Sequence, residues 1–171
     1  MSVMTRFLHR LFLTIARLFL VAWIGGAALF VITSIAEQRT PEFDSTIKNR
    51  LATVRFPLYY LFGVICLSTS IMATGLAAVT ERQGHKKKLI AGFALCLLSA
   101  VVTAYDYYGV YIPLQNTITP PELDRGLEFH VLHTRSRVIN EIHVSIALVA
   151  AILICLPTMP LVQLPEKQNM E

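Results

Sequence analysis

Four long apolar runs restrict the fold of this chain more than any other feature of its sequence. They cover residues 18–36, 56–80, about 89–110 and 138–156. Each is close to the roughly 20 residues that an α-helix needs to cross a bilayer. Inside a bilayer the backbone must satisfy its own hydrogen bonds, and a helix does so within one segment. We therefore predict an all-α membrane protein, a four-helix bundle that forms a single four-span domain over residues 1–171.

The composition favours this class over the others. The chain is 54% hydrophobic and only 15% charged, whereas about a quarter of the residues in a soluble domain are charged. Its net charge of +4 comes from short basic clusters beside the apolar runs, a pattern typical of segments that bind anionic lipid headgroups. The predicted partner is the lipid bilayer and not nucleic acid, since the sequence has no basic face with interleaved aromatic residues. Cys66, Cys96 and Cys155 lie within apolar runs without CxxC spacing, so we interpret them as small buried hydrophobic residues.

The segments outside the runs predict the topology. Residues 1–17 form a basic amphipathic lead-in that continues into the first span. That span is longer than the apolar core of a cleaved signal peptide, so we expect it to be retained. The lead-in and the lysines at 86–88 predict a cell-membrane protein with both termini on the cytoplasmic side. Between the first two spans, Phe43, Ile47 and Leu51 recur every fourth residue and predict a short surface helix.

A fourth helix longer than its membrane span is predicted to start near Thr119. Thr119, Pro120 and Glu122 match the N-cap, first-turn and third positions of a helix start. The next proline after this start is Pro157, so a continuous helix would have about 36 residues and a length of roughly 54 Å. Such a helix would project from the membrane, with Gly126 as a bend, and it would be followed by a polar tail.

A stripe of polar side chains marks the entry of this helix into the membrane. His133, Ser136, Asn140 and His143 are three or four residues apart and therefore share one helix face. Polar groups at membrane depth are costly unless they face protein or a water-filled cavity. We predict that the stripe faces the bundle interior and that its hydrogen bonds to other helices fix the packing of the fourth span.

Metal-ion binding or transport is an alternative interpretation of the same region. His130 and His133 are one turn apart and could bind a copper- or zinc-like ion together with Asp106. Asp106 could instead pair with an arginine or act in a proton relay, because it is the only acid near the end of the third span. A haem-binding electron carrier is a further alternative, in which inward histidines ligate the iron. The sequence has no HExxH motif and no nucleophile elbow, so we predict no catalytic residue and no enzymatic activity.

Small residues in the first run predict close helix packing. Gly25 and Gly26 are followed by two alanines, and such patches let helix backbones approach each other. The same patch would allow a homo-oligomer or contact with another membrane protein. Trp23 lies two residues before it, and we expect its indole N–H to find a hydrogen-bond partner in the bundle.

Five short motifs occur in order along most of the chain. They are Trp23-Ile24-Gly25-Gly26, Pro41-x-Phe43, Arg55-Phe56-Pro57-Leu58-Tyr59-Tyr60, Tyr111-Ile112-Pro113 and Phe129-x-x-Leu132-His133-x-x-Ser136-x-x-x-Asn140. Together they resemble the transmembrane protein 205-like family, also described as domain of unknown function 4149. The resemblance implies a four-helix membrane unit, and it implies no defined biochemical role.

Overall fold

The computed structural model describes residues 3–81 and 85–156, and every regular element within these ranges is a helix. The elements are α1 (Val3–Arg39), α2 (Ser45–Thr80), α3 (Lys86–Asp106), the π-helical segment η1 (Tyr107–Tyr111), α4 (Ile112–Asn116) and α5 (Leu127–Cys155). α3, η1 and α4 follow one another without a break. α1, α2, this composite helix and α5 are each long and apolar enough to cross a membrane. The predicted all-α four-helix bundle is confirmed, and the four helices are consistent with a multi-pass membrane protein.

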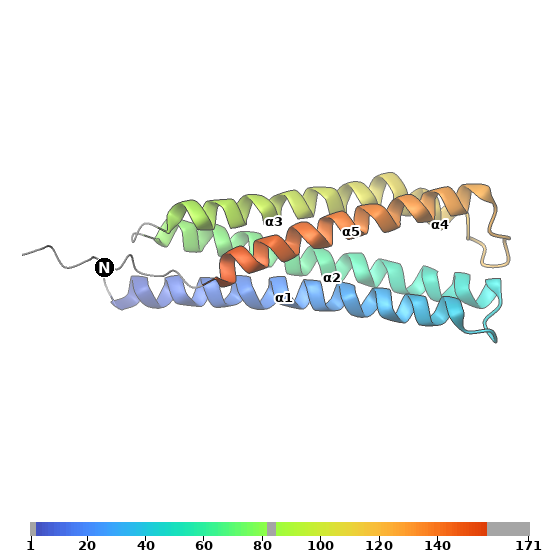
Figure 1. Cartoon of the computed structure of the whole chain (residues 1–171), viewed down its shortest axis with the longest axis horizontal. Helices are drawn as coiled ribbons and strands as arrows, with labels where there is room; N and C mark the ends of the chain where they lie inside the picture. Colours follow the sequence, from blue (N-terminus) through green and yellow to red (C-terminus); the bar gives the residue numbers. More distant parts are fainter. Residues whose placement is uncertain (1–2, 82–84, 157–171) are drawn as a thin grey trace, which may run out of the picture.

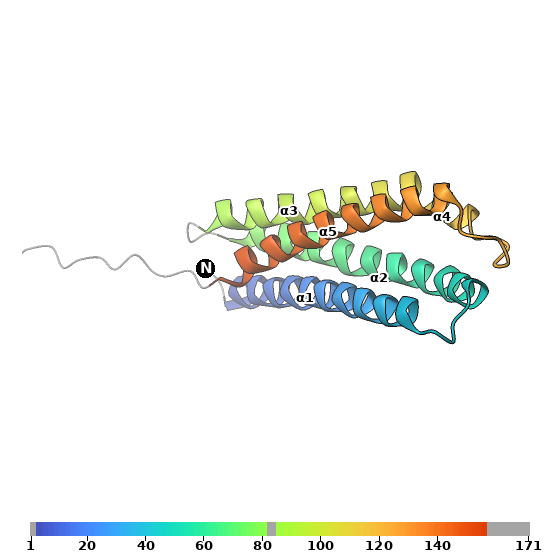
Figure 2. The same cartoon turned by 45° about the vertical axis from the view of Figure 1, so that its right-hand side comes forward.

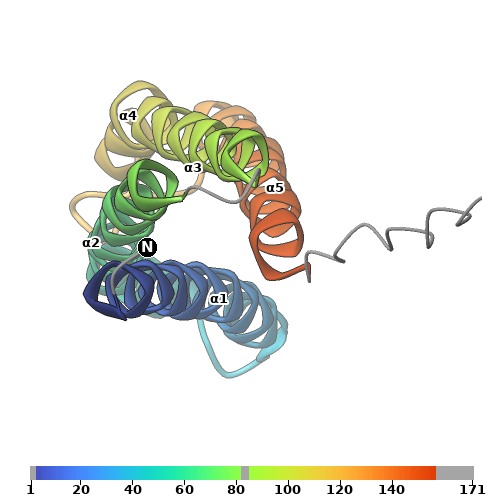
Figure 3. The same ribbon diagram turned by 90° about the vertical axis from the view of Figure 1, so that its left-hand side faces the viewer.

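The four long helices form a ring. α1 lies against α2, α2 against α3, and α3 against α5, as the end-on view in Figure 3 shows. α5 closes the ring against α1, but these two helices share the smallest interface of the four. α5 begins beside α4 and approaches α1 only toward its C-terminal end (Figures 1 and 2). The seam between α1 and α5 therefore widens toward the end of the bundle that carries the α1–α2 turn.

The connection between α1 and α2 is shorter than predicted. α2 begins directly after Asp44, whose Oδ1 accepts a hydrogen bond from the backbone N–H of Ile47 at 2.8 Å. An aspartate at this position satisfies an N–H group that has no partner within the helix. The prediction of a separate surface helix is wrong, because Ile47 and Leu51 lie in the first turns of α2. Pro57 lies inside the same helix.

The predicted start of the fourth helix at Thr119 is also wrong. α5 begins at Leu127, and Gly126 is its N-cap residue and not a bend within it. The segment before Gly126 takes a non-helical path because α2 holds it. The side chain of Asn49 donates hydrogen bonds to the backbone carbonyls of Pro121 at 2.9 Å and Leu123 at 3.1 Å.

The length of α5 is correspondingly smaller than expected. Its 29 residues span about 44 Å, which still exceeds a hydrocarbon core of about 30 Å. The predicted helix stop at Pro157 and the polar tail lie outside the described residues.

Trp23 is at the centre of the contact between α1 and α2. Its indole is fully buried, and a Cβ added at Gly63 would lie 2.7 Å from the ring, so glycine is needed there. Gly26 makes room for the ring of Phe62 in the same way, as the small-residue patch predicts. Gly25 makes no such contact with the described residues, because a Cβ there would have none of their heavy atoms within 4 Å. The expected partner of the Trp23 indole N–H is absent among the described residues.

Two cations hold the C-terminal end of α5. Arg17 of α1 donates from Nε and Nη2 to the carbonyl of Ile154, at 3.2 and 3.0 Å. Lys88 of α3 donates from Nζ to the carbonyl of Leu156 at 2.5 Å. The last carbonyls of a helix lack intrahelical partners and carry partial negative charge, so both contacts stabilise this end. They fix α5 between its two neighbours where the ring is closed.

Candidate functional site

Asp106 is the buried polar centre of the bundle. It is the last residue of α3, and its side chain is 1% exposed. The hydroxyl of Tyr60 on α2 donates to Asp106 Oδ2 at 2.6 Å, and Ser136 Oγ on α5 donates to the same oxygen at 3.2 Å. Asp106 Oδ1 has no hydrogen-bond partner among the described residues. The carboxyl group therefore connects three helices through one oxygen and leaves the other unsatisfied, and its partners are hydroxyl groups and not the predicted arginine.

The predicted stripe on α5 divides into a buried and a more exposed part. Ser136 and His143 are buried, and Asn140 is half-buried. The hydroxyl of Tyr59 donates to Asn140 Oδ1 in a short hydrogen bond. Ser136 and Asn140 thus bond across helices, to α3 and α2 respectively. His133 lies nearer the start of α5, where it is exposed and stacks on Phe129 with ring centroids 5.5 Å apart.

The predicted metal ligands are not brought together. His130 is exposed and meets Phe129 edge-on, while Asp106 is buried between Tyr60 and Ser136. Within residues 3–81 and 85–156, no group of three or more His, Cys, Asp or Glu side chains lies close enough to hold a metal ion. His130, His133 and Asp106 therefore do not form a three-ligand site in this structure.

His143 is part of the core of the bundle. It is fully buried and stacks on Trp23 with ring centroids 5.8 Å apart and an interplanar angle of 16°. Neither ring nitrogen has a partner in the described part of the chain. Its backbone carbonyl accepts a hydrogen bond from Ser99 Oγ of α3 at 2.9 Å. This residue therefore packs as an aromatic ring and makes no side-chain hydrogen bond of the predicted kind.

The π-helical segment η1 directly follows Asp106. It is closed by a hydrogen bond from the backbone N–H of Ile112 to the carbonyl of Tyr107, an i to i+5 pairing. Short π-helical turns within α-helices occur frequently at functional sites. Here the segment turns both Val110 and Tyr111 into the interior, where they are 0% and 3% exposed. The Tyr111 ring stacks on Phe56 with centroids 5.6 Å apart.

A cavity of about 370 Å³ lies beside Asp106, between α1 and α5. Its inner wall includes Asp106 and its two hydrogen-bond donors, Tyr60 and Ser136. Aromatic rings from α1 and α2 line its sides, and exposed residues of α1 and α5 surround its mouth. The aromatic residues are Phe30, Phe56 and Tyr59, and the exposed residues are Val31, Ile35, Gln38, Arg39, His133, Arg137 and Glu141. The cavity is therefore apolar at its sides, polar at its inner wall and charged at its mouth.

A smaller cavity of about 70 Å³ adjoins the first one toward the end of the bundle that carries the α1–α2 turn. The two share six lining residues, which are Phe30, Ser34, Gln38, Phe56, Leu114 and His133. The smaller one is also lined by Tyr111, whose buried hydroxyl has no partner among the residues that the structure describes. It ends near Arg125, at the loop before α5.

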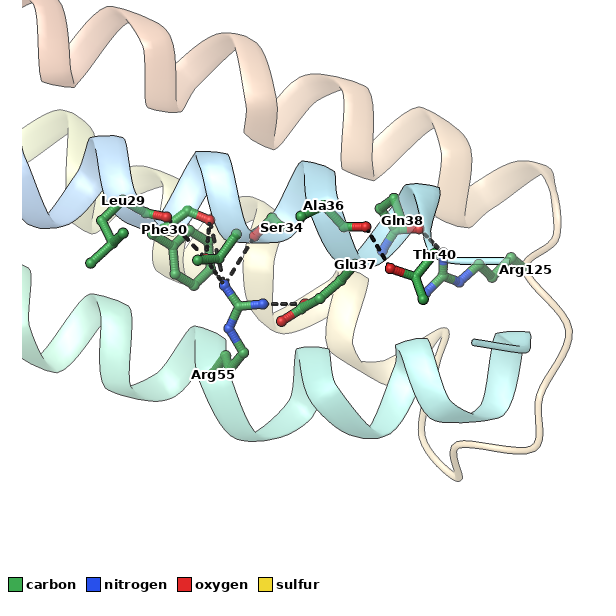
Figure 4. A network of polar contacts seen from close by, with 10 residues as sticks. Leu29, Phe30, Ser34, Ala36, Glu37, Gln38, Thr40, Arg55 and Arg125 are labelled. Atoms are coloured by element: carbon green, nitrogen blue, oxygen red, sulfur yellow. Dashed lines mark hydrogen bonds and ion pairs between the residues drawn. The ribbon is translucent and has the colours of Figure 1, made fainter. Parts of the chain in front are cut away.

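Two arginines fix α1 beside these cavities, as Figure 4 shows. Arg55 of α2 forms an ion pair with Glu37, donates to Thr33 Oγ1 at 2.6 Å and lies over the ring of Phe30 at 5.0 Å. Arg125 donates from Nη1 to Gln38 Oε1 at 2.9 Å. These contacts tie the last turns of α1 to α2 and to the loop that precedes α5.

The loop before α5 is held by a second polar cluster. Asn49 is fully buried, and besides its two bonds to backbone carbonyls it accepts a hydrogen bond from Arg125 Nε at 2.8 Å. Burial lowers the pKa of Arg125 below its usual value. On the surface Arg50 forms an ion pair with Glu122 at 3.0 Å, and this hydrogen bond lowers the pKa of the Glu122 carboxyl group. These contacts therefore tie the loop before α5 to α2 at the end of the bundle that carries the α1–α2 turn.

Sequence reasoning did not identify Tyr59 and Tyr60 as site residues. Two tyrosines at the start of a span suggest a membrane-interface belt. In the structure they are only 7% and 4% exposed, and both hydroxyls donate to polar groups in the interior. A usable signal was present, since a lone acid in an apolar segment needs donors from a neighbouring helix and tyrosine provides one.

None of the protein-family models, curated proteins or solved structures compared with this chain matches it. The fold and the site together define a class: a bundle of four membrane-spanning-length helices with an apolar cavity that ends at a buried carboxyl group. Such a cavity can hold a small molecule that is largely apolar and carries one polar group.

Proposed function

We propose that this chain is a non-enzymatic multi-pass membrane protein that binds a small amphipathic molecule between α1 and α5. One observation carries the proposal: Asp106 Oδ1 is buried and unpartnered, and its carboxyl group belongs to the wall of a 370 Å³ cavity. A buried polar atom without a partner costs free energy, and an occupant that supplies a donor would recover it. The volume lies within the range of small-molecule sites, which is about 300–1,000 Å³.

A purely structural role explains less of the site. Interhelical hydrogen bonding accounts for Tyr59 with Asn140 and for Tyr60 with Asp106. It accounts neither for the second carboxyl oxygen nor for the space beside it. Metal and haem binding gain no support, because His133 is exposed and His143 packs on Trp23 without a facing histidine. We also propose membership of the transmembrane protein 205-like family, on the five motifs, and a cell-membrane location with both termini cytoplasmic.

Photolabelling in lipid nanodiscs tests the binding function. The probe is 4-hydroxybenzophenone, an uncharged aromatic molecule whose phenol can donate to Asp106 Oδ1. After irradiation, peptide mass spectrometry locates the label. We expect saturable labelling of α1 residues 30–38 and α5 residues 133–141, which line the cavity.

A matched pair of variants completes the design. Ser34 lines both cavities, so Ser34→Phe should fill the site and abolish the labelling. Ser68 is exposed on α2, so Ser68→Phe adds the same ring elsewhere and should leave the labelling unchanged. Equal labelling in both variants, or label spread over all exposed apolar faces, would refute the proposed site.

A further inference from the structure

We infer that the occupant of the cavity is a lipophilic organic cation, a molecule with an ammonium group on an aromatic or aliphatic body. This inference rests on the proposed binding function and specifies its ligand class. It follows from the acceptor at the inner wall, the aromatic sides and the distribution of charge around the cavity.

The acceptor is a carboxyl oxygen in a dry environment. Both donors of the protein, Tyr60 and Ser136, donate to Asp106 Oδ2, and the buried Oδ1 is the carboxyl oxygen that has no partner among the described residues. A buried carboxylate is stable only when it is paired with a positive charge or several donors. Within the described residues, no lysine, arginine or histidine forms an ion pair or hydrogen bond with Asp106. An ammonium group would supply both a positive charge and a hydrogen-bond donor at this position.

The side walls favour the same ligand. Phe30 stacks on Tyr59 with ring centroids 4.4 Å apart and meets Phe56 edge-on at 5.0 Å. Aromatic faces attract cations, and the attraction is strongest where water is excluded. Phe30 already binds one cation, since the guanidinium of Arg55 lies 5.0 Å from its ring centre. The cavity thus combines a carboxyl group with electron-rich rings.

The charges at the mouth do not reverse this preference. Arg39, Arg137 and Glu141 are all exposed, so water and salt screen their fields. Glu141 follows Arg137 by one helical turn, where opposite charges partly compensate. Of the Asp, Glu, Lys, Arg and His side chains that line the cavity in the described part of the chain, only Asp106 is buried.

A charged probe and its neutral isostere test the inference directly. N,N-Dimethylbenzylammonium and isobutylbenzene have nearly the same shape, and only the first carries a positive charge and an N–H donor. Binding is measured in phosphatidylglycerol nanodiscs, which contain no ammonium groups, with empty nanodiscs as background. Trp23 is the only tryptophan of the chain and lies 5.0 Å from Tyr59, so its fluorescence reports the cavity.

We expect the wild-type protein to bind the cation at least about tenfold more tightly than the isostere. Asp106→Asn keeps an oxygen acceptor for Tyr60 and Ser136 but removes the charge, and it should abolish this preference while neutral binding persists. Glu128→Gln removes an exposed acid of α5 that does not line the cavity and should leave the preference intact.

The possible failures are distinguishable. Binding of neither probe would overturn the proposed function. Equal binding of both probes by the wild type would leave the binding function standing and overturn the cation inference, even if Asp106→Asn does not fold. A preference that survives in Asp106→Asn or disappears in Glu128→Gln would also overturn it. Phosphatidylethanolamine in the nanodiscs then identifies the source. Competition by its primary ammonium group indicates a lipid headgroup, and a lack of competition indicates a free amine.

Discussion

Tyr60→Phe probes the Asp106 cluster directly, because it removes one hydroxyl group and keeps the buried ring. The lost hydrogen bond is 2.6 Å long, ends on a carboxyl oxygen and lies where Tyr60 is only 4% exposed. Hydrogen bonds to charged groups contribute about 1.5–3 kcal/mol, and ordinary ones about 0.5–1.5 kcal/mol. We therefore expect the free energy of unfolding to fall by about 2 kcal/mol.

Two further tyrosines provide matched comparisons. The hydroxyl of Tyr59 bonds the uncharged amide oxygen of Asn140, so Tyr59→Phe should cost about 1 kcal/mol. Tyr108 is 71% exposed, so Tyr108→Phe should change the stability by less than about 0.5 kcal/mol. The three variants make the same chemical change and differ only in the environment of the hydroxyl group.

Thermal unfolding in detergent, followed by the fluorescence of Trp23, measures this order. For a chain of 171 residues, 1 kcal/mol corresponds to about 2–4 °C, so Tyr60→Phe should lower Tm by about 4–8 °C. If Tyr60→Phe has the same Tm as Tyr108→Phe, the carboxyl group of Asp106 does not accept the hydrogen bond from Tyr60. If Tyr59→Phe is the more damaging change, Asp106 is not the stronger acceptor, and the basis of the proposed site is refuted.

Three other outcomes are expected. Asn49→Ala removes the hydrogen-bond partner of two loop carbonyls and of Arg125 Nε. It should lower the free energy of unfolding by about 3 kcal/mol in a denaturant titration. A loss below about 1 kcal/mol would contradict the described cluster. Gly63→Ala forces a methyl group against the buried indole of Trp23 and should lower the free energy of unfolding by about 1–3 kcal/mol. Gly25→Ala should change it by less than about 0.5 kcal/mol, and thermal unfolding of the two variants compares the effects. Since the pKa of Glu122 is lowered in the folded protein, its pairing with Arg50 is present above the ordinary pKa of glutamate and is lost as the pH falls through the folded value. Arg50→Ala should raise that pKa in a carbon-13 NMR titration, and an unchanged value would show that the pair does not form in solution.

The fold was predictable from the sequence because long apolar runs have one main solution in a membrane. The errors occurred where a tertiary contact decides a helix boundary. The start pattern at Thr119 is locally sound, but Asn49, far away in sequence, binds the carbonyls of the loop that follows. The surface helix before the second span failed for a simpler reason, because the N-cap at Asp44 starts α2 early enough to include it.

The candidate site was predicted only in part. Ser136 and Asn140 have the helical spacing of an inward face, and both bond to other helices in the structure. Their partners Asp106 and Tyr59 lie on other helices, and spacing within one helix contains no information about them. The π-helical turn adds a further obstacle. In a regular α-helix, Tyr111 would lie roughly 140° around the axis from Asp106, whereas the i to i+5 bonding of η1 turns both residues inward.

The position of the cavity follows from how the helices are fixed at their ends. At one end Arg17 joins α1 directly to the last turn of α5. At the other end Arg55 holds α1 to α2, and Arg125 holds it to the loop before α5, so neither contact joins α1 to α5 itself. The two helices are therefore clamped together at one end and fixed separately at the other, and they diverge in between. Asp106 lies where this divergence leaves space, so the same polar contacts that order the bundle also place its buried acid in the wall of a cavity.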